Sequence, residues 1–133
     1  MSFFRKNRKK KEQTKNDLIS EESIPVPSLA RLNVDVFQAS DSIIVYAQVA
    51  GANMSSIDVS VEGEADILII RGKRLRPEHL IAQVEKDGDF CTEECVWGNF
   101  KRKIFLPARV DVDQAQAKLK DGILILSLPL LFD

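Results

Sequence analysis

The sequence has few of the residues from which catalytic and metal sites are built. Its 133 residues include one histidine, His79, and two cysteines, Cys91 and Cys95. His79 stands alone in a polar stretch, without a companion for a metal site or a catalytic triad, so a plain surface role is the simpler interpretation. The Cys-x-x-x-Cys spacing differs from that of common zinc sites, and no second Cys or His pair exists to complete one. Gly72-Lys73 lacks the earlier glycine of a phosphate-binding loop, so we expect no enzyme activity, no metal and no cofactor.

Long apolar runs are also missing from the sequence. No window approaches the roughly 18 apolar residues needed to span a bilayer, and the basic N-terminus lacks the apolar core of a signal peptide. We therefore predict a cytoplasmic protein without a transmembrane segment. In the cytosol Cys91 and Cys95 are expected to be free thiols, whereas an oxidising compartment would allow them to pair.

Charge is unevenly distributed along the chain, although the net charge is only −1. Residues 1–17 carry seven lysines and arginines against Glu12 and Asp17, which gives +5. The remaining residues contain 12 basic and 18 acidic side chains, which gives −6. A basic arm on an acidic body can fold back onto its own domain, bind an acidic partner or stay solvated.

Residues 1–23 show no usable hydrophobic periodicity. Phe3-Phe4 is the only large apolar pair among the first 17 residues, and such a composition buries too little to offset the entropy of ordering. We therefore predict a disordered basic N-terminal arm and linker over residues 1–30. It lacks the interleaved aromatic residues that stack on bases, so no specific nucleic-acid partner is expected. Within it, Ile24-Pro25-Val26-Pro27 is extended, because each proline fixes its own φ and biases the preceding residue away from helix.

From residue 32 onward the apolar residues follow the period of β-strands. Residues 32–37, 43–49, 57–61 and 67–73 form four such runs, and turn residues separate them. No segment from 32 to 74 keeps helical spacing. Residues 75–97 are instead a polar insert, in which a short strand is expected around residues 90–94.

Three more strands are predicted after the insert. Residues 100–106 form one strand, which ends at Pro107. Residues 117–120 and 123–128 are joined by Asp121-Gly122, a two-residue hairpin turn in which the glycine supplies a positive φ. The second of these runs is apolar at five of six positions, which predicts a strand covered for most of its length. Short strands separated by turns predict an all-β sandwich of two antiparallel sheets.

Two sequence motifs carry a family resemblance. Residues 117–124, AKLKDGIL, look like the A-x-x-x-n-G-v-L signature of the small heat-shock protein family, and residues 98–107, GNFKRKIFLP, are similar to its G-x-F-x-R…L-P segment. The motifs lie in the family's order, and the earlier strands fit its first strands. The chain therefore resembles the α-crystallin domain over residues 31–130, an immunoglobulin-like antiparallel β-sandwich. Residues 131–133 are expected to be a residual C-terminus without the family's C-terminal extension.

The resemblance implies an ATP-independent molecular chaperone, a holdase that binds unfolding proteins and prevents their aggregation. Unpaired strand edges are a liability for most proteins, but they suit a domain that must add foreign strands. The implied partners are unfolding client proteins, further copies of the chain in a dimer or a larger oligomer, and ATP-dependent chaperones that act downstream. The alternative function is a dimeric interaction adaptor, tethered by its basic arm to an anionic membrane or to nucleic acid.

The resemblance also implies two sites on the domain. In the family, a groove between two strands accepts an extended I-x-I/V motif or a client. The bacterial and plant members exchange a strand of the insert between partners, and Arg102 stands where the family has an arginine that supports dimer contacts. The groove residues would be Ile57, Val59, Val61, Ala117 and Leu119. The dimer-interface residues would be Phe90, Cys91, Thr92, Glu93, Glu94 and Arg102.

Ile24-Pro25-Val26 has the I-x-V form, at the opposite end of the chain from the family's own motif. We hypothesise that Ile24 and Val26 fill the groove of their own or of a neighbouring subunit. The alternative is an incidental match in a plain linker. Cys91 and Cys95 lie in the predicted dimer segment, so control of assembly by oxidation is a further hypothesis.

Overall fold

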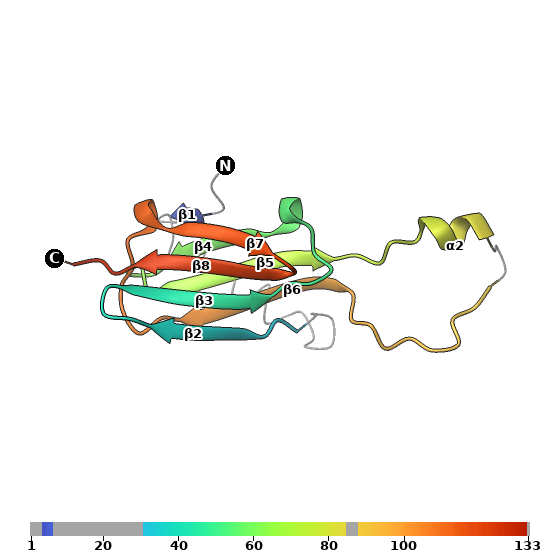
Figure 1. Cartoon of the computed structure of the whole chain (residues 1–133), viewed down its shortest axis with the longest axis horizontal. Helices are drawn as coiled ribbons and strands as arrows, with labels where there is room; N and C mark the ends of the chain where they lie inside the picture. Colours follow the sequence, from blue (N-terminus) through green and yellow to red (C-terminus); the bar gives the residue numbers. More distant parts are fainter. Residues whose placement is uncertain (1–3, 7–30, 85–87, 133) are drawn as a thin grey trace.

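The computed structural model describes residues 4–6, 31–84 and 88–132 of the chain. Within these residues eight strands form two sheets that pack face to face (Figure 1). The first sheet has the order β1-β4-β5-β6, with β1 at Phe4–Lys6, β4 at Asp58–Glu62, β5 at Ile67–Arg74 and β6 at Gly98–Phe105. The second sheet has the order β2-β3-β8-β7, with β2 at Val34–Gln38, β3 at Ser42–Gln48, β7 at Gln116–Lys120 and β8 at Ile123–Pro129. The short helices are η2 at Met54–Ser56, α2 at His79–Val84 and η3 at Val112–Gln114.

The chain crosses between the sheets twice after β2. Strands β2 and β3 form a hairpin in the second sheet, and β4, β5 and β6 form a meander in the first. Strands β7 and β8 then return to the second sheet, where β8 pairs with β3. All of these pairs are antiparallel, so the predicted all-β sandwich of two antiparallel sheets is confirmed.

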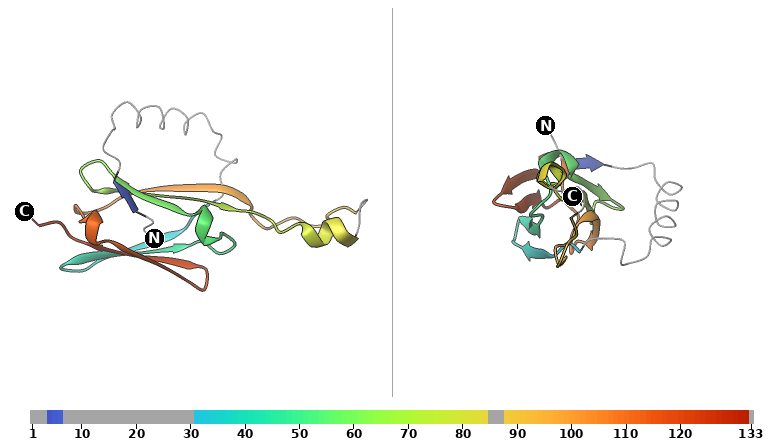
Figure 2. Two further views of the ribbon diagram at one scale, coloured as in Figure 1. Left: turned by 90° about the horizontal axis from the view of Figure 1, so that it is seen from above. Right: turned by 90° about the vertical axis from the view of Figure 1, so that its right-hand side faces the viewer.

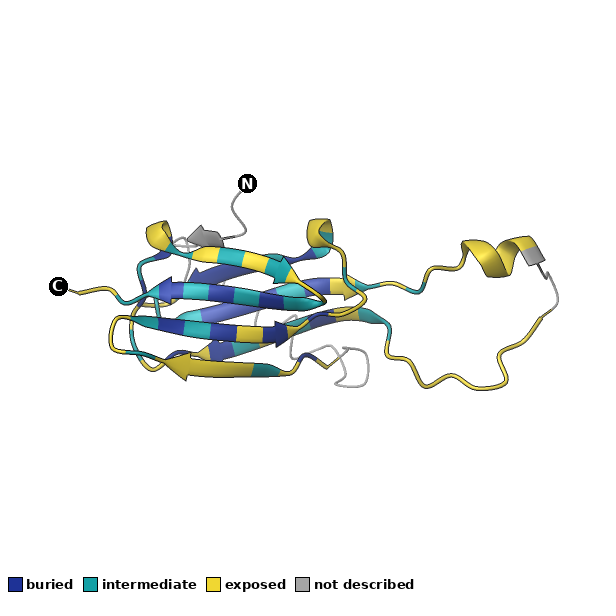
Figure 3. Ribbon diagram, viewed as in Figure 1, coloured by how far each residue is buried: buried dark blue, intermediate teal, exposed yellow. Residues whose placement is uncertain are grey.

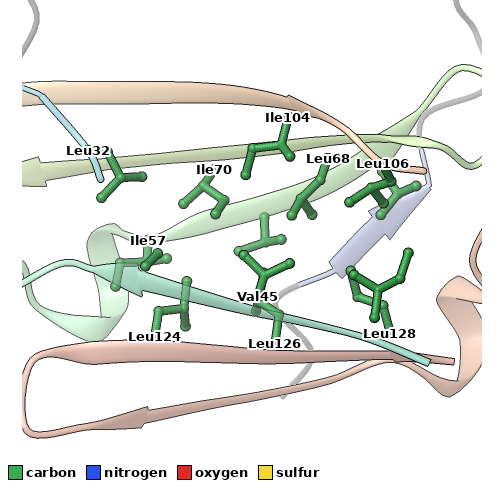
Figure 4. Close-up of a cluster of buried hydrophobic side chains, with 14 of the residues drawn as sticks. Leu32, Val45, Ile57, Leu68, Ile70, Ile104, Leu106, Leu124, Leu126 and Leu128 are labelled. Carbon is green, nitrogen blue, oxygen red and sulfur yellow. The ribbon is translucent and has the colours of Figure 1, made fainter. Parts of the chain in front are cut away.

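Alternation along the strands sends every second side chain into the space between the sheets. Figure 3 shows this alternation along β3 and β8, and Figure 4 shows apolar side chains of both sheets meeting between them. Burying one Val, Leu or Ile side chain contributes about 1.5–3 kcal/mol, so this layer is the main source of stability. The fully buried residues of β3 and β8 are Ile43, Val45, Ala47, Leu124, Leu126 and Leu128.

Strand β8 is buried on one face only, although its apolar run predicts a strand covered for most of its length. Its outward-facing residues Ile123 and Ile125 are half-buried. Ile125 lies opposite Tyr46 of β3, and Tyr46 is 44% exposed. The run of apolar residues therefore combines an inward face that fills the core with an outward face that lines a shallow apolar surface.

The turn between β7 and β8 has the predicted conformation. Asp121 and Gly122 have φ values of 52° and 81°, and two successive positive φ values are typical of a type I′ hairpin turn. A Cβ at Gly122 would also lie 3.1 Å from the Cβ of Ala50, so the position has little room for a side chain. This turn fixes the register in which Leu119 of β7 pairs with Leu124 of β8.

Of the predicted N-terminal arm and linker, residues 1–30, the structure describes Phe4–Lys6. These residues form β1, which pairs in parallel with β4, the exception to the antiparallel pairing. The outer edge of β4 offers backbone N–H and C=O groups, and a short extended segment can pair with them whatever its composition. The predicted groove-filling residues Ile24 and Val26 lie outside the described residues.

The polar insert extends from one end of the sandwich (Figures 1 and 2). We call residues 75–97 the arm; its described part is 75–84 and 88–97. It contains α2, a six-residue helix that the sequence did not predict. The expected short strand around residues 90–94 is absent, and these residues pair with no strand in the described part of the chain. No helix in the described part of the chain is long and apolar enough to cross a membrane.

A glycine in β5 makes room for the largest side chain of the core. Gly72 pairs with Phe100 of β6, which is 2% exposed. A Cβ at Gly72 would lie 2.9 Å from Cε1 of Phe100 and nearer still to Cζ. The Cζ of Arg74 lies 5.1 Å from the centre of the same ring, which is within the range of a cation–π contact. The position is therefore restricted to glycine by packing.

We expect Gly72→Ala to lower the free energy of unfolding by about 1–3 kcal/mol, because the added methyl group forces the Phe100 ring out of its rotamer or displaces the backbone. Urea unfolding measures this change. The same substitution in a Phe100→Leu background should cost less, since the smaller side chain leaves room for the methyl group. An equal cost in both backgrounds would show that Phe100 is not the source of the constraint.

Candidate functional site

The five predicted groove residues come from two strands that face each other along one side of the sandwich (Figure 1). Val59 and Val61 lie on β4, Ile57 directly precedes it, and Ala117 and Leu119 lie on β7. The three residues at β4 are buried in the core. Ala117 and Leu119 are half-buried and pack against the same core. The structure therefore gathers the five residues into one apolar cluster between β4 and β7.

This side of the sandwich presents backbone edges to its surroundings. Strand β7 pairs with β8 and ends the second sheet, so its outer edge has no other described strand beside it. The outer edge of β4 is paired with β1 from Val59 to Val61. Backbone N–H and C=O groups on such edges can bind a further extended chain.

The chain's own residues occupy part of the edge that the sequence assigned to the groove. Phe4, Arg5 and Lys6 lie opposite Val59, Ser60 and Val61 in the parallel register, and β1 also contacts η3, which leads into β7. Sequence reasoning placed Ile24 and Val26 here instead. The signal for β1 was the Phe3-Phe4 pair, the only large apolar pair in the first 17 residues, but a three-residue strand leaves no alternation to detect.

Two capped turns fix the ends of the groove strands. Before β4, the side chain of Asn53 accepts a hydrogen bond from the backbone N–H of Ser56 at 3.1 Å. The Ser56 hydroxyl donates to the carbonyl of Lys73 at 3.2 Å, which ties the entry of β4 to the end of β5. Before β7, the side chain of Asp111 accepts from the N–H of Asp113 at 3.2 Å, and Val112 is buried as an anchor. Both strands therefore enter the groove side from rigid turns.

Arg102, predicted at the dimer interface, makes a contact within its own chain. It lies on β6, the strand at the other edge of the first sheet, and its Nη1 donates to the carbonyl of Leu32 at 2.8 Å. Leu32 is buried and precedes β2. Arg102 therefore joins the two sheets along the side opposite the groove, and any dimer contact would come in addition to this one.

The other predicted dimer residues lie together on the returning limb of the arm. Phe90, Cys91, Thr92, Glu93 and Glu94 are all exposed, and Cys91 and Cys95 are free thiols. Sequence reasoning missed Arg76, which lies on the outgoing limb and contacts Phe90, Glu93 and Trp97. Its positive charge, one of two in a mostly acidic insert, was the available signal.

A separate hollow of about 440 Å³ lies on the outward face of the second sheet. Tyr46 and Gln48 of β3, Lys120 of β7, and Ile123 and Ile125 of β8 contribute to its lining. None of the predicted site residues lines it. The hollow is therefore a feature of the apolar outward face described above and is distinct from the groove.

The arrangement suits binding of extended chains. Among the described residues no group of three or more His, Cys, Asp or Glu could hold a metal ion. Exposed apolar residues are spread over both sheets and the arm, with Phe37 at 62% and Phe105 at 72% exposure. Strand edges can form backbone hydrogen bonds with an added extended segment, and exposed apolar side chains can contact its apolar residues.

Comparison with known proteins agrees with this architecture. A model of the Hsp20/alpha crystallin family matches residues 35–131. The chain is 28% identical over 95 residues to small heat shock protein C4 of Rickettsia felis, an alignment that covers 71% of this chain and 54% of that protein. It is 28% identical over 119 residues to the 17.7 kDa class II heat shock protein of Arabidopsis thaliana, covering 89% of this chain and 72% of that protein. The chain thus spans about half the length of the Rickettsia relative.

A solved structure shares the fold. Heat shock protein 16.0 of Schizosaccharomyces pombe aligns with a TM-score of 0.65 at 24% identity, covering 77% of this chain and 88% of that one. The matched family is non-enzymatic and its members are generally ATP-independent chaperones, as the sequence motifs imply. The family match covers most of the described sandwich and the fold agrees with it, so this chain belongs to the Hsp20/alpha crystallin family of small heat shock proteins.

Proposed function

We propose that this chain is a holdase that binds unfolding client proteins by strand addition and keeps them from aggregating without ATP. The observation that carries the proposal is the parallel pairing of Phe4–Lys6 with β4, an edge that accepts a short added strand. Main-chain hydrogen bonds supply such binding with little regard to sequence, which suits a chaperone with many clients. A protein that binds the unfolded state acts by mass action, so no catalytic group is required.

The groove between β4 and β7 is the proposed docking edge. A client segment that pairs with β4 would compete with β1 for the backbone groups of Val59, Ser60 and Val61. Because β1 is only three residues long, a longer apolar segment forms more hydrogen bonds and can displace it. Ile24 and Val26 are a second candidate occupant, supported by their I-x-V form.

We propose that the arm makes the dimer. Strand β2 ends the second sheet with one edge beside no other described strand, and residues 90–94 of the arm lack a strand partner within their own chain. Pairing the arm of one copy with β2 of another would satisfy both sets of backbone groups and give a closed two-fold exchange. Higher oligomers and hand-over of clients to ATP-dependent chaperones are part of the same proposal.

A cytoplasmic location fits the free thiols. Cys91 and Cys95 are both exposed and unpaired in the structure, and reducing compartments keep such thiols free. The alternative function is an adaptor tethered by the basic residues of the N-terminal arm. Its association with an anionic partner should be sensitive to salt, which distinguishes it from the holdase.

We expect the full-length protein to suppress light scattering from a heat-denatured model protein in the absence of ATP, since client binding removes aggregating chains from solution. Scattering at several molar ratios measures the effect, with serum albumin at equal mass as the control. Failure at several-fold excess would contradict the holdase function. A client-independent association with anionic vesicles or nucleic acid that disappears on deleting residues 2–15 would favour the adaptor.

The occupant of the groove can be identified by two variants. Deleting residues 2–6 removes β1 and should increase the capture of unfolded client, because the edge of β4 becomes available. Ile24→Asp with Val26→Asp should shift the oligomer distribution in native mass spectrometry if these residues occupy the groove, since charged side chains are costly to bury. An unchanged distribution would exclude Ile24 and Val26, and unchanged capture after the deletion would exclude β1 as a competitor.

A further inference from the structure

One arginine of the arm makes side-chain contacts to residues of both limbs. The backbone ladder between β5 and β6 ends at the Arg74–Gly98 pair, where the outgoing and returning limbs of the arm begin. Beyond that pair, Nη2 of Arg76 on the outgoing limb lies 2.9 Å from Oε2 of Glu93 on the returning limb. Arg76 therefore joins the limbs where the sheet no longer does.

The same guanidinium also contacts two aromatic rings. Its Cζ lies 4.2 Å from the centre of the Phe90 ring and 5.9 Å from that of Trp97, both within the range of a cation–π contact. These residues, together with Glu93, recur at intervals of three and four along the returning limb. We call Arg76, Phe90, Glu93 and Trp97 the arm clamp.

Arg76 is more sheltered than its acidic partners. The side chain of Arg76 is 24% exposed, against 55% for Glu93 and 66% for Glu78, whose Oε1 lies 3.9 Å from Nη1. A planar guanidinium can donate to a carboxylate in its plane while its face lies on a ring, which an ammonium group cannot do. The arrangement therefore requires arginine specifically.

The arm carries a net negative charge, so the positive charge of Arg76 offsets repulsion between its acidic residues. Residues 75–97 contain six acidic residues and two basic ones, Arg76 and Lys86. Arg76 is held between Glu78 on its own limb and Glu93 on the other. Without it, two like charges would remain near each other at the root of the arm, and their repulsion would separate the limbs.

We propose that Arg76 is the positioning residue for exchange of the arm between two copies of this chain. The clamp holds the limbs in one shape before binding and leaves Leu75 and Val96 beside it 65% and 55% exposed, available to a second copy. Ordering the arm in advance lowers the conformational entropy lost when it docks. The inference rests on the proposed arm-mediated dimer and adds the residue that determines its affinity.

The test measures the dimer dissociation constant of the full-length protein by sedimentation equilibrium over a dilution series. Arg76→Ala should weaken the dimer by about tenfold, the combined effect of an ion pair and a cation–π contact of modest strength. Arg76→Lys should recover part of the affinity, because it keeps the charge and loses the planar stack. Glu93→Gln is a milder variant that removes the ion pair alone. Lys118→Ala on β7 removes one positive charge from an exposed site outside the arm and should leave the affinity unchanged.

The fluorescence of Trp97 reports on the clamp itself. Trp97 is the only tryptophan in the sequence, so Arg76→Ala should shift its emission toward that of a solvated indole even in dilute, monomeric protein. Circular dichroism and the urea midpoint should remain unchanged, since the clamp lies outside the core. A shift in emission without any loss of dimer affinity in Arg76→Ala or Glu93→Gln would overturn the proposal.

A variant with a shortened arm distinguishes the positioning role of Arg76 from the arm-mediated dimer itself. Replacing residues 76–96 by a short Gly-Ser turn should give a monomer. If it does while Arg76→Ala still dimerises normally, arm exchange stands and the positioning role of Arg76 is wrong. If the shortened chain dimerises as well as the full one, the arm does not make the dimer, and both proposals fall.

Discussion

Backbone N–H and C=O groups on the outer side of an edge strand need a hydrogen-bond partner, which is either water or another strand. Among the described strands, β7 and β2 of the second sheet and β6 of the first have outer edges without a partner strand. The outer edge of β4 is paired with β1. The placement of β1 and the missing strand around residues 90–94 are both consistent with this hydrogen-bond requirement. A segment forms a strand here only where an edge is available to pair with it.

The packing of the hydrophobic core does not depend on hydrogen bonding at the outer strand edges. An edge can therefore pair with another chain while the core stays packed. Inward residues of β3, β5 and β8 fill the space between the sheets, and Arg102 ties β6 to the carbonyl of Leu32 along the side opposite the groove. Because the core side chains point into the space between the sheets, away from the backbone groups of the outer edges, a chain can be added at an edge without opening the core.

The sequence predicted the parts of the fold that depend on local pattern. The predictions of alternation along β3 and β7, of the Asp121-Gly122 turn and of the sandwich itself are confirmed. Hydrophobic period and turn conformation depend on residues that are neighbours in the sequence. The sequence did not predict β1, whose strand conformation comes from the distant edge of β4, or α2, which has too few residues to show a helical period. The Arg76 contacts were missed for the same reason, since they join residues from opposite limbs of the arm.

In the proposed function clients bind at strand edges, and β1 and the client compete for the edge of β4. Hydrogen–deuterium exchange of the backbone amides, with and without a bound heat-unfolded client, tests it most directly. We expect client binding to speed exchange in Phe4–Lys6 as β1 is displaced, while Asp58–Glu62 keeps or gains protection and the interior strands β5 and β8 are unchanged. Client binding that leaves both Phe4–Lys6 and Asp58–Glu62 unchanged, and protects only residues elsewhere, would contradict it.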